Sequence, residues 1–511
     1  MLNHRLNLRR WWACAAAVIA LGAAPAHATT ITVATISEPP SLDPATTSDL
    51  VSMITQHMFE TLYTYNSEWK VAPLLAAGFP EISKDGLHYV ITLRPGLKFH
   101  TGAAVTPADV AASLERWLKA SPRGKLASES VTSIKGQGNN KVEITLKEAF
   151  PPLLALLAYP NGAAAVMPKA IAEASTNAPL KEYVGTGPFR FLERKPDQYI
   201  RLVKFDQYSS PTGTPNGFAG SRVAKVDELR FVPVPNANTR LEGVLAGQFD
   251  YADSLNSEFY DKIKASTTVK PAVIKPASWA FLIFNTKQGV MADPNLRLAA
   301  QAAIQPESMM IGGFGNPDLI NLESSLFPKQ SMFHSTADAA LYNQKDGTAK
   351  AKQMLAKAGY KGQPIRILTS PQYDFLYKMS QVAAQNLQEA GFKVDLQVVD
   401  WATLLQKRGD PAVWDGFFTF HGFVPEPALV SIVNPSYPGW WDSPAKRAAF
   451  DKFSGEQTDA ARVKAWAEMQ KLFMEEAPTL KIGEFSNLGA SSRKLTGFTP
   501  MIFPAFWNVA R

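Results

Sequence analysis

The chain is poor in the residues that build covalent or metal-centred sites. Cys14 is the single cysteine among its 511 residues, so neither a disulfide framework nor a zinc–thiolate centre can be assembled. Its 7 histidines form no H-E-x-x-H motif. We therefore predict that the protein has no bound metal and no cofactor.

Catalytic and nucleotide-binding motifs are also missing. The sequence contains no G-x-S-x-G nucleophile elbow, no Walker A motif and no Rossmann fingerprint, and no S-x-x-K serine site stands out. The glycine-rich stretch 312–315 lacks the required spacing and lysine. The stretch Gly185–Pro188 is typical of a tight turn before a strand rather than of a phosphate loop. We predict that the protein is not an enzyme.

Charge of one sign is not concentrated anywhere. The 52 Lys+Arg and 45 Asp+Glu residues give a net charge of +7, and no run of five or more basic residues occurs. A nucleic-acid partner is therefore disfavoured. The composition, 46% hydrophobic and 19% charged, is that of a globular protein with a large core, and the length suggests two to four domains.

The first 28 residues have the three parts of a secretory signal. Arg5, Arg9 and Arg10 form a basic region, Trp11–Ala24 is apolar, and Ala26–Ala28 is an A-x-A cleavage site. The apolar part is shorter than the roughly 20 residues that a membrane-spanning helix needs. Sec export is the simpler interpretation, although the Arg9–Arg10 pair leaves the twin-arginine route open.

Cleavage after Ala28 would start the mature chain near Thr29. It removes three arginines and Cys14, which leaves 49 basic and 45 acidic residues and no cysteine. A chain without thiols suits an oxidising compartment. We predict a periplasmic protein.

Strand-like and helix-like patterns alternate along the mature chain, which favours an α/β architecture. Thr106 and Pro107 are typical of a helix start, and Gly359 of a helix end. The predicted strands are Ile31–Thr35, Leu87–Leu93, Val142–Leu146, Phe189–Glu193, Val226–Val234, Phe281–Asn285, Ile365–Thr369 and Lys393–Val399. The predicted helices are Leu50–Tyr63, Pro107–Ala120, Asn236–Ala246, Pro294–Ile304, Ala349–Ala358, Tyr377–Ala390 and Val463–Glu476.

Several collinear segments together resemble one family, the large substrate-binding proteins of ABC importers for peptides, nickel and related solutes (family 5 extracellular solute-binding proteins). The resemblance extends from about residue 30 to about residue 508. The segments are Glu38–Pro44 (EPPSLDP), Met58–Leu62 (MFETL), Leu93–Gly102 (LRPGLKFHTG), Thr106–Val110 (TPADV), Gly185–Phe189 (GTGPF), Val226–Pro235 (VDELRFVPVP), Gly247–Asp250 (GQFD), Phe284–Thr286 (FNT), Asp293–Arg297 (DPNLR) and Ala356–Tyr360 (AKAGY).

The resemblance implies an α/β, two-lobed periplasmic-binding-protein fold (Venus flytrap) with an extra subdomain inserted in lobe one. We expect lobe one to comprise residues 29–282 plus 484–511, with the inserted subdomain at about 72–182. Lobe two would be 283–483. The resemblance also implies a monomer that closes on its ligand by a hinge motion and delivers it to the permease subunits of the membrane complex.

Relatives that bind peptides line the cleft with a tryptophan at the position of Trp401, and an arginine at the position of Arg408 can meet a ligand carboxylate. Arginine suits that role because of its planar donor fork. Ordinary core packing remains the alternative for Trp401, and a surface ion pair for Arg408.

The aspartate that pairs with a peptide ammonium in these relatives has no counterpart here. The aligned position holds Phe423 or Val424, and Glu426 could substitute only if the loop were rearranged. Phe420 and Phe423, with His421, are interpreted as an apolar cleft floor carrying one polar group, and core packing is the alternative for each phenylalanine.

Three further points depend on position relative to the family's motifs. Asp49 and Trp279 are expected to bind ligand from lobe one. His421 could instead face a chelated metal, as in nickel-binding relatives. The aromatic loop Pro438–Pro444 either borders the cleft or caps the helix after Ser443, and capping is favoured.

The function that the sequence predicts is the periplasmic substrate-binding component of an ABC importer. Its ligand would be a peptide-like or other small carboxylate-bearing organic solute. A nickel-chelate or opine/aromatic-acid receptor of the same fold is the alternative, and a secreted hydrolase is a remote one.

Overall fold

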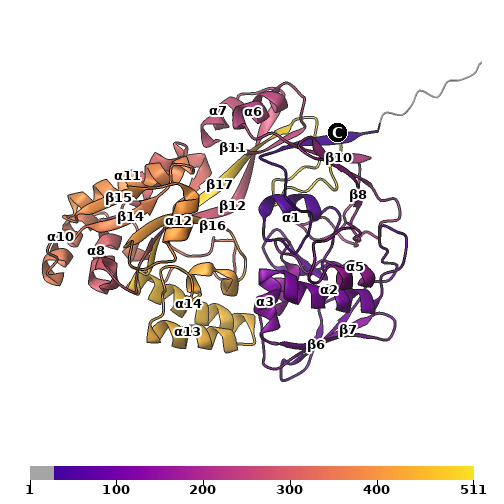
Figure 1. Cartoon of the computed structure of the whole chain (residues 1–511), viewed down its shortest axis with the longest axis horizontal. Helices are drawn as coiled ribbons and strands as arrows, with labels where there is room; N and C mark the ends of the chain where they lie inside the picture. The colour runs from indigo at the N-terminus through magenta and orange to yellow at the C-terminus, as the bar shows by residue number, and fades with distance from the viewer. Residues whose placement is uncertain (1–27) are drawn as a thin grey trace, which may run out of the picture.

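The computed structural model describes residues 28–511, so the predicted signal segment and Cys14 lie outside the described residues. The chain forms two α/β lobes connected by the long strands β12 (Val269–Phe284) and β17 (Thr479–Ser492), as Figure 1 shows. The predicted two-lobed α/β fold is confirmed.

One eleven-stranded sheet runs through both lobes, in the order β15-β14-β16-β12-β17-β11-β1-β10-β9-β8, with β13 paired to β17. The outer strands β14 to β16 belong to lobe two, and β1 and β8 to β11 to lobe one (Figure 1). Their bounds are β1 Thr30–Thr35, β8 Phe189–Lys195, β9 Tyr199–Lys204, β10 Glu228–Pro233, β11 Tyr251–Leu255, β13 Ile320–Asn321, β14 Ile365–Thr369, β15 Val394–Val398 and β16 Gly416–Gly422.

Lobe one also contains a separate four-stranded sheet of order β4-β5-β7-β6. Helices α2 and α3 pack beside it (Figure 1). The strands are β4 Glu81–Ile82, β5 His88–Thr92, β6 Val131–Gln137 and β7 Lys141–Leu146, and the pair β2 Tyr63–Tyr65 and β3 Val71–Pro73 precedes them.

Most predicted helices are present with ends shifted by a few residues. The helix start at Thr106 is confirmed, because its hydroxyl and the Asp109 carboxylate cap each other's backbone N–H. The helices are α1 Asp49–Thr55, α2 Pro107–Ala120, α3 Pro122–Ser128, α4 Leu153–Ala158, α5 Lys169–Ala174, α6 Ala237–Leu245, α7 Tyr260–Lys264, α8 Pro294–Ala303, α9 Pro306–Phe314, α10 Gly347–Ala358, α11 Asp374–Glu389, α12 Trp401–Lys407, α13 Pro444–Gly455 and α14 Asp459–Glu476.

The predicted helix Leu50–Tyr63 is wrong beyond Thr55. The backbone carbonyls of His57 and Met58 accept hydrogen bonds from Phe189 N and Gly187 N, at 3.0 and 2.9 Å, instead of from the next helical turn. Residues 56–63 are buried on all sides, so their apolar character reflects burial rather than a helical face. The turn Gly185–Pro188 packs against this segment, as a structural turn.

The two lobes also contact each other through residues outside β12 and β17. Tyr159 Oη donates a 2.7 Å hydrogen bond to the carbonyl of Phe423, and the ring of Phe423 lies 4.7 Å from that of Trp69. Tyr159 and Trp69 belong to lobe one, and Phe423 belongs to lobe two. These contacts connect the lobes where the chain itself does not cross between them.

Candidate functional site

A cleft of about 760 Å³ lies between the lobes. Lobe one lines it through α1, α3 and the turn after α4, and lobe two through β12, β16 and the loops that follow β16. This volume lies within the roughly 300–1,000 Å³ of a typical small-ligand pocket. The lining residues include Asp49, Arg123, Tyr159, Asn161, Trp279, Phe420, His421, Phe423, Val424, Leu429, Val430, Asn434 and Tyr437.

Lobe one contributes two charged groups joined by one amide. Asn161 Nδ2 donates to Asp49 Oδ1 at 2.8 Å. Arg123 Nε donates to the Asn161 carbonyl at 2.6 Å, and Arg123 Nη2 donates to Asn161 Oδ1 at 3.2 Å. A carboxylate and a guanidinium are thereby held at fixed positions on one wall of the cleft.

Local structure explains how Arg123 and Asn161 come together. Arg123 is the second residue of α3, and Ser121 caps that helix by accepting from Arg123 N. The Ser121 hydroxyl also donates to the carbonyl of Gly162 at 2.9 Å. The guanidinium lies 4.6 Å from the ring centroid of Tyr159, which adds a cation–π contact.

The cleft environment changes the proton affinities of both charged groups. Desolvation raises the pKa of Asp49, while the Asn161 hydrogen bond and the charge of Arg123 act in the opposite direction. Desolvation lowers the pKa of Arg123, and nearby Tyr159, Tyr65 and Asp49 oppose that shift. The hydrogen bonds that Arg123 makes go to a neutral amide residue, so it retains its capacity to bind an anion.

Lobe two contributes an aromatic wall with a few polar atoms. Trp279 in β12 is the register partner of His421 in β16, so the two side chains are neighbours across the strands. The Trp279 ring packs against Phe423 at 5.7 Å. His421 Nε2 lies 2.8 Å from Tyr437 Oη, and Arg408 Nη1 donates to the same hydroxyl at 3.4 Å.

Burial is the main cause that lowers the pKa of His421 to about 4, and the charge of Arg408 adds to it. The imidazole is therefore neutral at pH 7. Two buried nitrogens of this wall, Trp279 Nε1 and His421 Nδ1, have no hydrogen-bond partner among the described residues.

Five of the seven residues that the sequence nominated line the cleft. These are Asp49, Trp279, Phe420, His421 and Phe423. The ring of Phe420, however, packs against Tyr373 and Phe375 at 4.8 and 5.5 Å. Successive side chains of a strand point to opposite faces, so Phe420 and His421 diverge. Trp279 lies in β12, which pairs with β16. It is therefore on the lobe-two side of the cleft, whereas the sequence predicted a place in lobe one.

Trp401 and Arg408 are not among the residues of the described chain that line the cleft. Trp401 packs 4.9 Å from Tyr373, beside a second hollow of about 780 Å³ that Tyr373, Phe375 and Phe485 line. Arg408 lies behind Tyr437, with its guanidinium 5.6 Å from that ring. A direct ligand contact of either residue stays a prediction.

Glu426 does not replace the missing ammonium anchor in this arrangement. Its carboxylate pairs with Arg462 at 2.5 Å, and both side chains are buried in lobe two. Among the residues of 28–511 that line the cleft, Asp49 is the only carboxylate. The loop Pro438–Pro444 serves both predicted roles, because Pro438 lines the cleft and Ser443 caps α13.

The sequence did not nominate Arg123, Asn161 or Tyr437. Arg123 follows a proline and a serine that mark a helix start, but nothing local indicates that this helix faces a cleft. The contact from Asn161 to Asp49 spans 112 positions and depends on the fold. Only a structure brings these side chains together.

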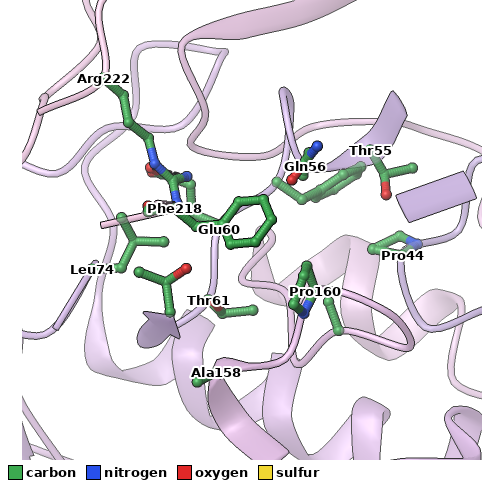
Figure 2. A pocket seen from close by; sticks show the side chains of 13 residues that line it. Pro44, Thr55, Gln56, Glu60, Thr61, Leu74, Ala158, Pro160, Phe218 and Arg222 are labelled. Carbon is green, nitrogen blue, oxygen red and sulfur yellow. Dashed lines mark hydrogen bonds and ion pairs between the residues drawn. The ribbon is translucent and has the colours of Figure 1, made fainter. Parts of the chain in front are cut away.

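A smaller cavity of about 20 Å³, shown in Figure 2, is lined by lobe-one residues. It contains the buried carboxylate of Glu60, the glutamate of the MFETL segment. Tyr208 and Thr186 donate to that carboxylate at 2.7 and 3.0 Å, and Arg222 pairs with it at 3.3 Å. These partners satisfy the carboxylate, so we interpret Glu60 as a structural residue of lobe one.

Residues 28–511 contain neither a metal-ligating cluster nor a helix that could span a membrane. No cluster of three or more His, Cys, Asp or Glu side chains suited to a metal ion occurs there. None of the helices in that range combines the length and apolarity needed to cross a bilayer.

Comparison with known proteins adds an independent line. The model of the family described as bacterial extracellular solute-binding proteins, family 5 Middle, matches residues 70–439. A probable peptide ABC transporter periplasmic-binding protein of Sinorhizobium fredii is 25% identical over 487 residues, which cover 91% of this chain and 90% of the relative.

Solved structures of periplasmic binding proteins are also similar to this chain. The periplasmic binding protein AgaA of A. tumefaciens R10, in complex with agropinic acid, has a TM-score of 0.73 and 26% identity, covering 93% of this chain and 96% of that one. NikA of Brucella suis, in complex with Fe(III)-EDTA, has a TM-score of 0.78 and 20% identity, covering 92% and 96% of the two chains.

Proposed function

The chain belongs to family 5 of the bacterial extracellular solute-binding proteins, the substrate-binding components of ABC importers, and we propose that its ligand is a small solute carrying both a carboxylate and an amine. The family consists of binding proteins that work with ABC permeases, and its relatives are periplasmic. The observation that carries the proposal is the Asp49–Asn161–Arg123 arrangement in the cleft.

Arg123 supplies a cation for the ligand's carboxylate. A guanidinium binds a carboxylate with parallel N–H donors, and the contact is stronger away from bulk water. Asp49 supplies the matching anion for an ammonium group. Because Asn161 holds both, the two charges are preorganised and their ordering costs little on binding.

The remaining wall favours an apolar or planar body. Phe423, Val424, Leu429 and Val430 line the cleft opposite the charged pair. Peptides and opines both combine charged ends with such a body, and the names of the compared relatives include a peptide transporter and an agropinic acid complex. A nickel chelate remains the alternative ligand.

Isothermal titration against dipeptides, opines and nickel with histidine separates these classes. We expect an amine-bearing carboxylate to bind and Arg123→Gln to weaken that binding at least tenfold, with Asp49→Asn weakening it for ligands that carry an amine. Arg190→Gln, an exposed lobe-one arginine, is the matched control and should bind as the wild type does. Binding of nickel–histidine alone, with Arg123→Gln unchanged, would contradict the proposal.

The finer points of export and assembly belong to the same proposal. We propose cleavage after Ala28, a monomeric mature protein, lobe boundaries within β12 and β17, and no catalytic turnover. N-terminal sequencing of periplasmic protein and light scattering measure the first two. Incubation with ester, peptide and glycoside substrates followed by mass spectrometry measures the last, and release of a product would contradict it.

A further inference from the structure

The lobe-two wall of the cleft contains two buried nitrogens that the fold leaves without partners. Trp279 is 1% exposed, and its Nε1 has no hydrogen-bond partner within residues 28–511; the same holds for His421 Nδ1. The two residues are register partners on adjacent strands, and both line the cleft. An unsatisfied buried polar group costs about 1–3 kcal/mol, so two neighbouring ones indicate a missing partner.

Trp279 Nε1 is a hydrogen-bond donor under all conditions, whereas His421 Nδ1 can donate or accept according to the tautomer. The other ring nitrogen, His421 Nε2, lies 2.8 Å from Tyr437 Oη. The tautomer therefore depends on which of these two atoms carries the shared hydrogen.

The contact with Arg408 determines which of the two atoms, Tyr437 Oη or His421 Nε2, carries the shared hydrogen. Arg408 Nη1 can only donate, and it donates to Tyr437 Oη at 3.4 Å. Among the described residues, Arg408 and His421 are the recorded partners of that hydroxyl. The hydroxyl hydrogen therefore has His421 Nε2 as its acceptor, which places the imidazole hydrogen on Nδ1.

The charge state supports the same arrangement. His421 stays neutral because burial and Arg408 lower its pKa to about 4, so one ring nitrogen remains an acceptor at pH 7. Nε2 fills that role by accepting from Tyr437.

We propose that Trp279 Nε1 and His421 Nδ1 form a pair of neutral N–H donors that binds an acceptor oxygen of the ligand, a carboxylate or carbonyl oxygen, from lobe two. Arg408 is a positioning residue in this scheme, since it acts through Tyr437 on the tautomer of His421. The inference depends on the proposed function, because it assigns a second contact within the same cleft. It also gives Arg408 a role that needs no direct contact with the ligand.

The tautomer is measured by nuclear magnetic resonance on full-length mature protein labelled with ¹⁵N in histidine and tryptophan. The His421 signals are assigned with a His421→Asn variant. We expect wild-type His421 to carry its hydrogen on Nδ1 at pH 7. In Tyr437→Phe the donor to Nε2 is lost, so we expect a substantial population with the hydrogen on Nε2.

Arg408→Gln keeps a side-chain N–H near the tyrosine but adds an acceptor, and it should shift the tautomer balance in the same direction, less strongly. Tyr377→Phe, on α11, is a matched control and should leave the His421 signals unchanged. A wild-type protein with the hydrogen on His421 Nε2 would overturn the inference. If a variant does not fold, the wild-type tautomer still decides.

Three small probes test the donor pair itself. Acetate carries a carboxylate, acetamide a neutral carbonyl, and methylammonium only donors. We expect acetate or acetamide at millimolar concentration to shift both the His421 Nδ1–H and Trp279 Nε1–H signals, and methylammonium to shift neither. Comparing the first two distinguishes the carboxylate from the carbonyl as the source of the oxygen.

The outcomes separate this inference from the proposed function. A protein that binds an amine-bearing carboxylate by titration but shows no response of either signal to acetate and acetamide contradicts the donor pair alone. A protein with the Nδ1–H tautomer and responsive signals that binds none of the tested amine-bearing solutes contradicts the proposed ligand class alone.

Discussion

At the scale of single residues, a histidine in the core should make the stability of the protein depend on pH. His57 is fully buried, and its Nε2 accepts a 2.9 Å hydrogen bond from the backbone N–H of Phe506. Burial lowers its pKa from 6.5 to about 3. The ring must therefore be neutral in the folded protein, although it takes up a proton in the unfolded chain below pH 6.5.

The sign of the effect follows from proton linkage. Between about pH 3 and pH 6.5 the unfolded state binds more protons at this site than the folded state. The free energy of unfolding therefore has its full value above pH 6.5 and decreases as the pH falls below it. At about 1.4 kcal/mol per pH unit, His57 should lower the free energy of unfolding by about 2–3 kcal/mol between pH 6.5 and pH 4. Urea unfolding at a series of pH values measures this.

A matched pair of variants isolates the contribution. His57→Gln retains an acceptor for Phe506 N but cannot take up a proton, so its free energy of unfolding should fall less steeply than that of the wild type below pH 6.5. His88 is exposed at the start of strand β5, and His88→Gln should keep the wild-type slope. Equal slopes for the wild type and His57→Gln would show that the core site does not couple to protons.

The family resemblance predicted part of the cleft. Asp49, Trp279, His421 and Phe423 were found through their positions relative to family motifs, and they line it. Arg123 and Asn161 were not found, because nothing in their neighbours in sequence distinguishes a cleft-facing arginine from a solvated one. Their roles come from contacts between segments far apart in the chain.

At the scale of elements, one turn determines the geometry of the charged pair. Gly162 follows Asn161 with φ +69°, and a Cβ there would lie 2.8 Å from Thr47 Cγ2 and 3.0 Å from Ser121 Oγ. The Gly162 carbonyl accepts from Trp117 Nε1 and from Ser121 Oγ, both at 2.9 Å. The turn therefore holds Asn161 in place between Asp49 and Arg123.

Gly162→Ala should weaken ligand binding as well as stability. The substitution adds about 1–2 kcal/mol of left-handed backbone strain and forces the turn away from Thr47 and Ser121, which displaces Asn161. We expect binding of the best solute from the titration panel to fall at least fivefold. Titration calorimetry and urea unfolding, carried out on the same preparation, measure the two effects.

The β6–β7 hairpin offers a matched control. Gly138 also has positive φ, +54°, but a Cβ there would meet no atom within 4 Å. Gly138→Ala should lose a similar amount of stability and bind with wild-type affinity. If both variants bound normally, the turn at Gly162 would have no part in positioning the site.

Local signals decided which elements were predicted correctly. Helix α2 was predicted because Thr106, Pro107 and Asp109 specify its start without help from the rest of the fold. The segment after Thr55 was predicted wrongly because burial on all sides imitates a helical pattern when only apolar spacing is read. Its backbone pairs instead with the turn at Gly187, about 130 positions away.

At the scale of the whole molecule, β12 and β17 are the strands that connect the two lobes. Their antiparallel pairing shifts register between Ile274 and Ser278, which marks an irregular point in otherwise continuous strands. The family resemblance, not the pattern of apolar residues, indicated that two crossings connect two lobes. Periodicity describes elements and contains no information on how distant elements are divided between lobes.

A hydrogen bond across the cleft should favour contact between the lobes. Tyr159 Oη in lobe one donates to the Phe423 carbonyl in lobe two, and water can take over both partners when the lobes separate. Tyr159→Phe should therefore stabilise the separated state by about 1 kcal/mol, increase the radius of gyration of ligand-free protein in X-ray scattering, and reduce ligand affinity about fivefold.

A second tyrosine shows whether the effect belongs to the lobes or to a lost hydroxyl. Tyr65 Oη donates to Ala155 O at 3.0 Å within lobe one, so Tyr65→Phe removes a comparable bond without touching the contact between lobes. It should lower the free energy of unfolding and leave both the radius of gyration and the affinity unchanged. If Tyr159→Phe behaved in the same way, the contact with Phe423 would hold lobe two in place without biasing closure, and the population of the closed form would have to be set at β12 and β17.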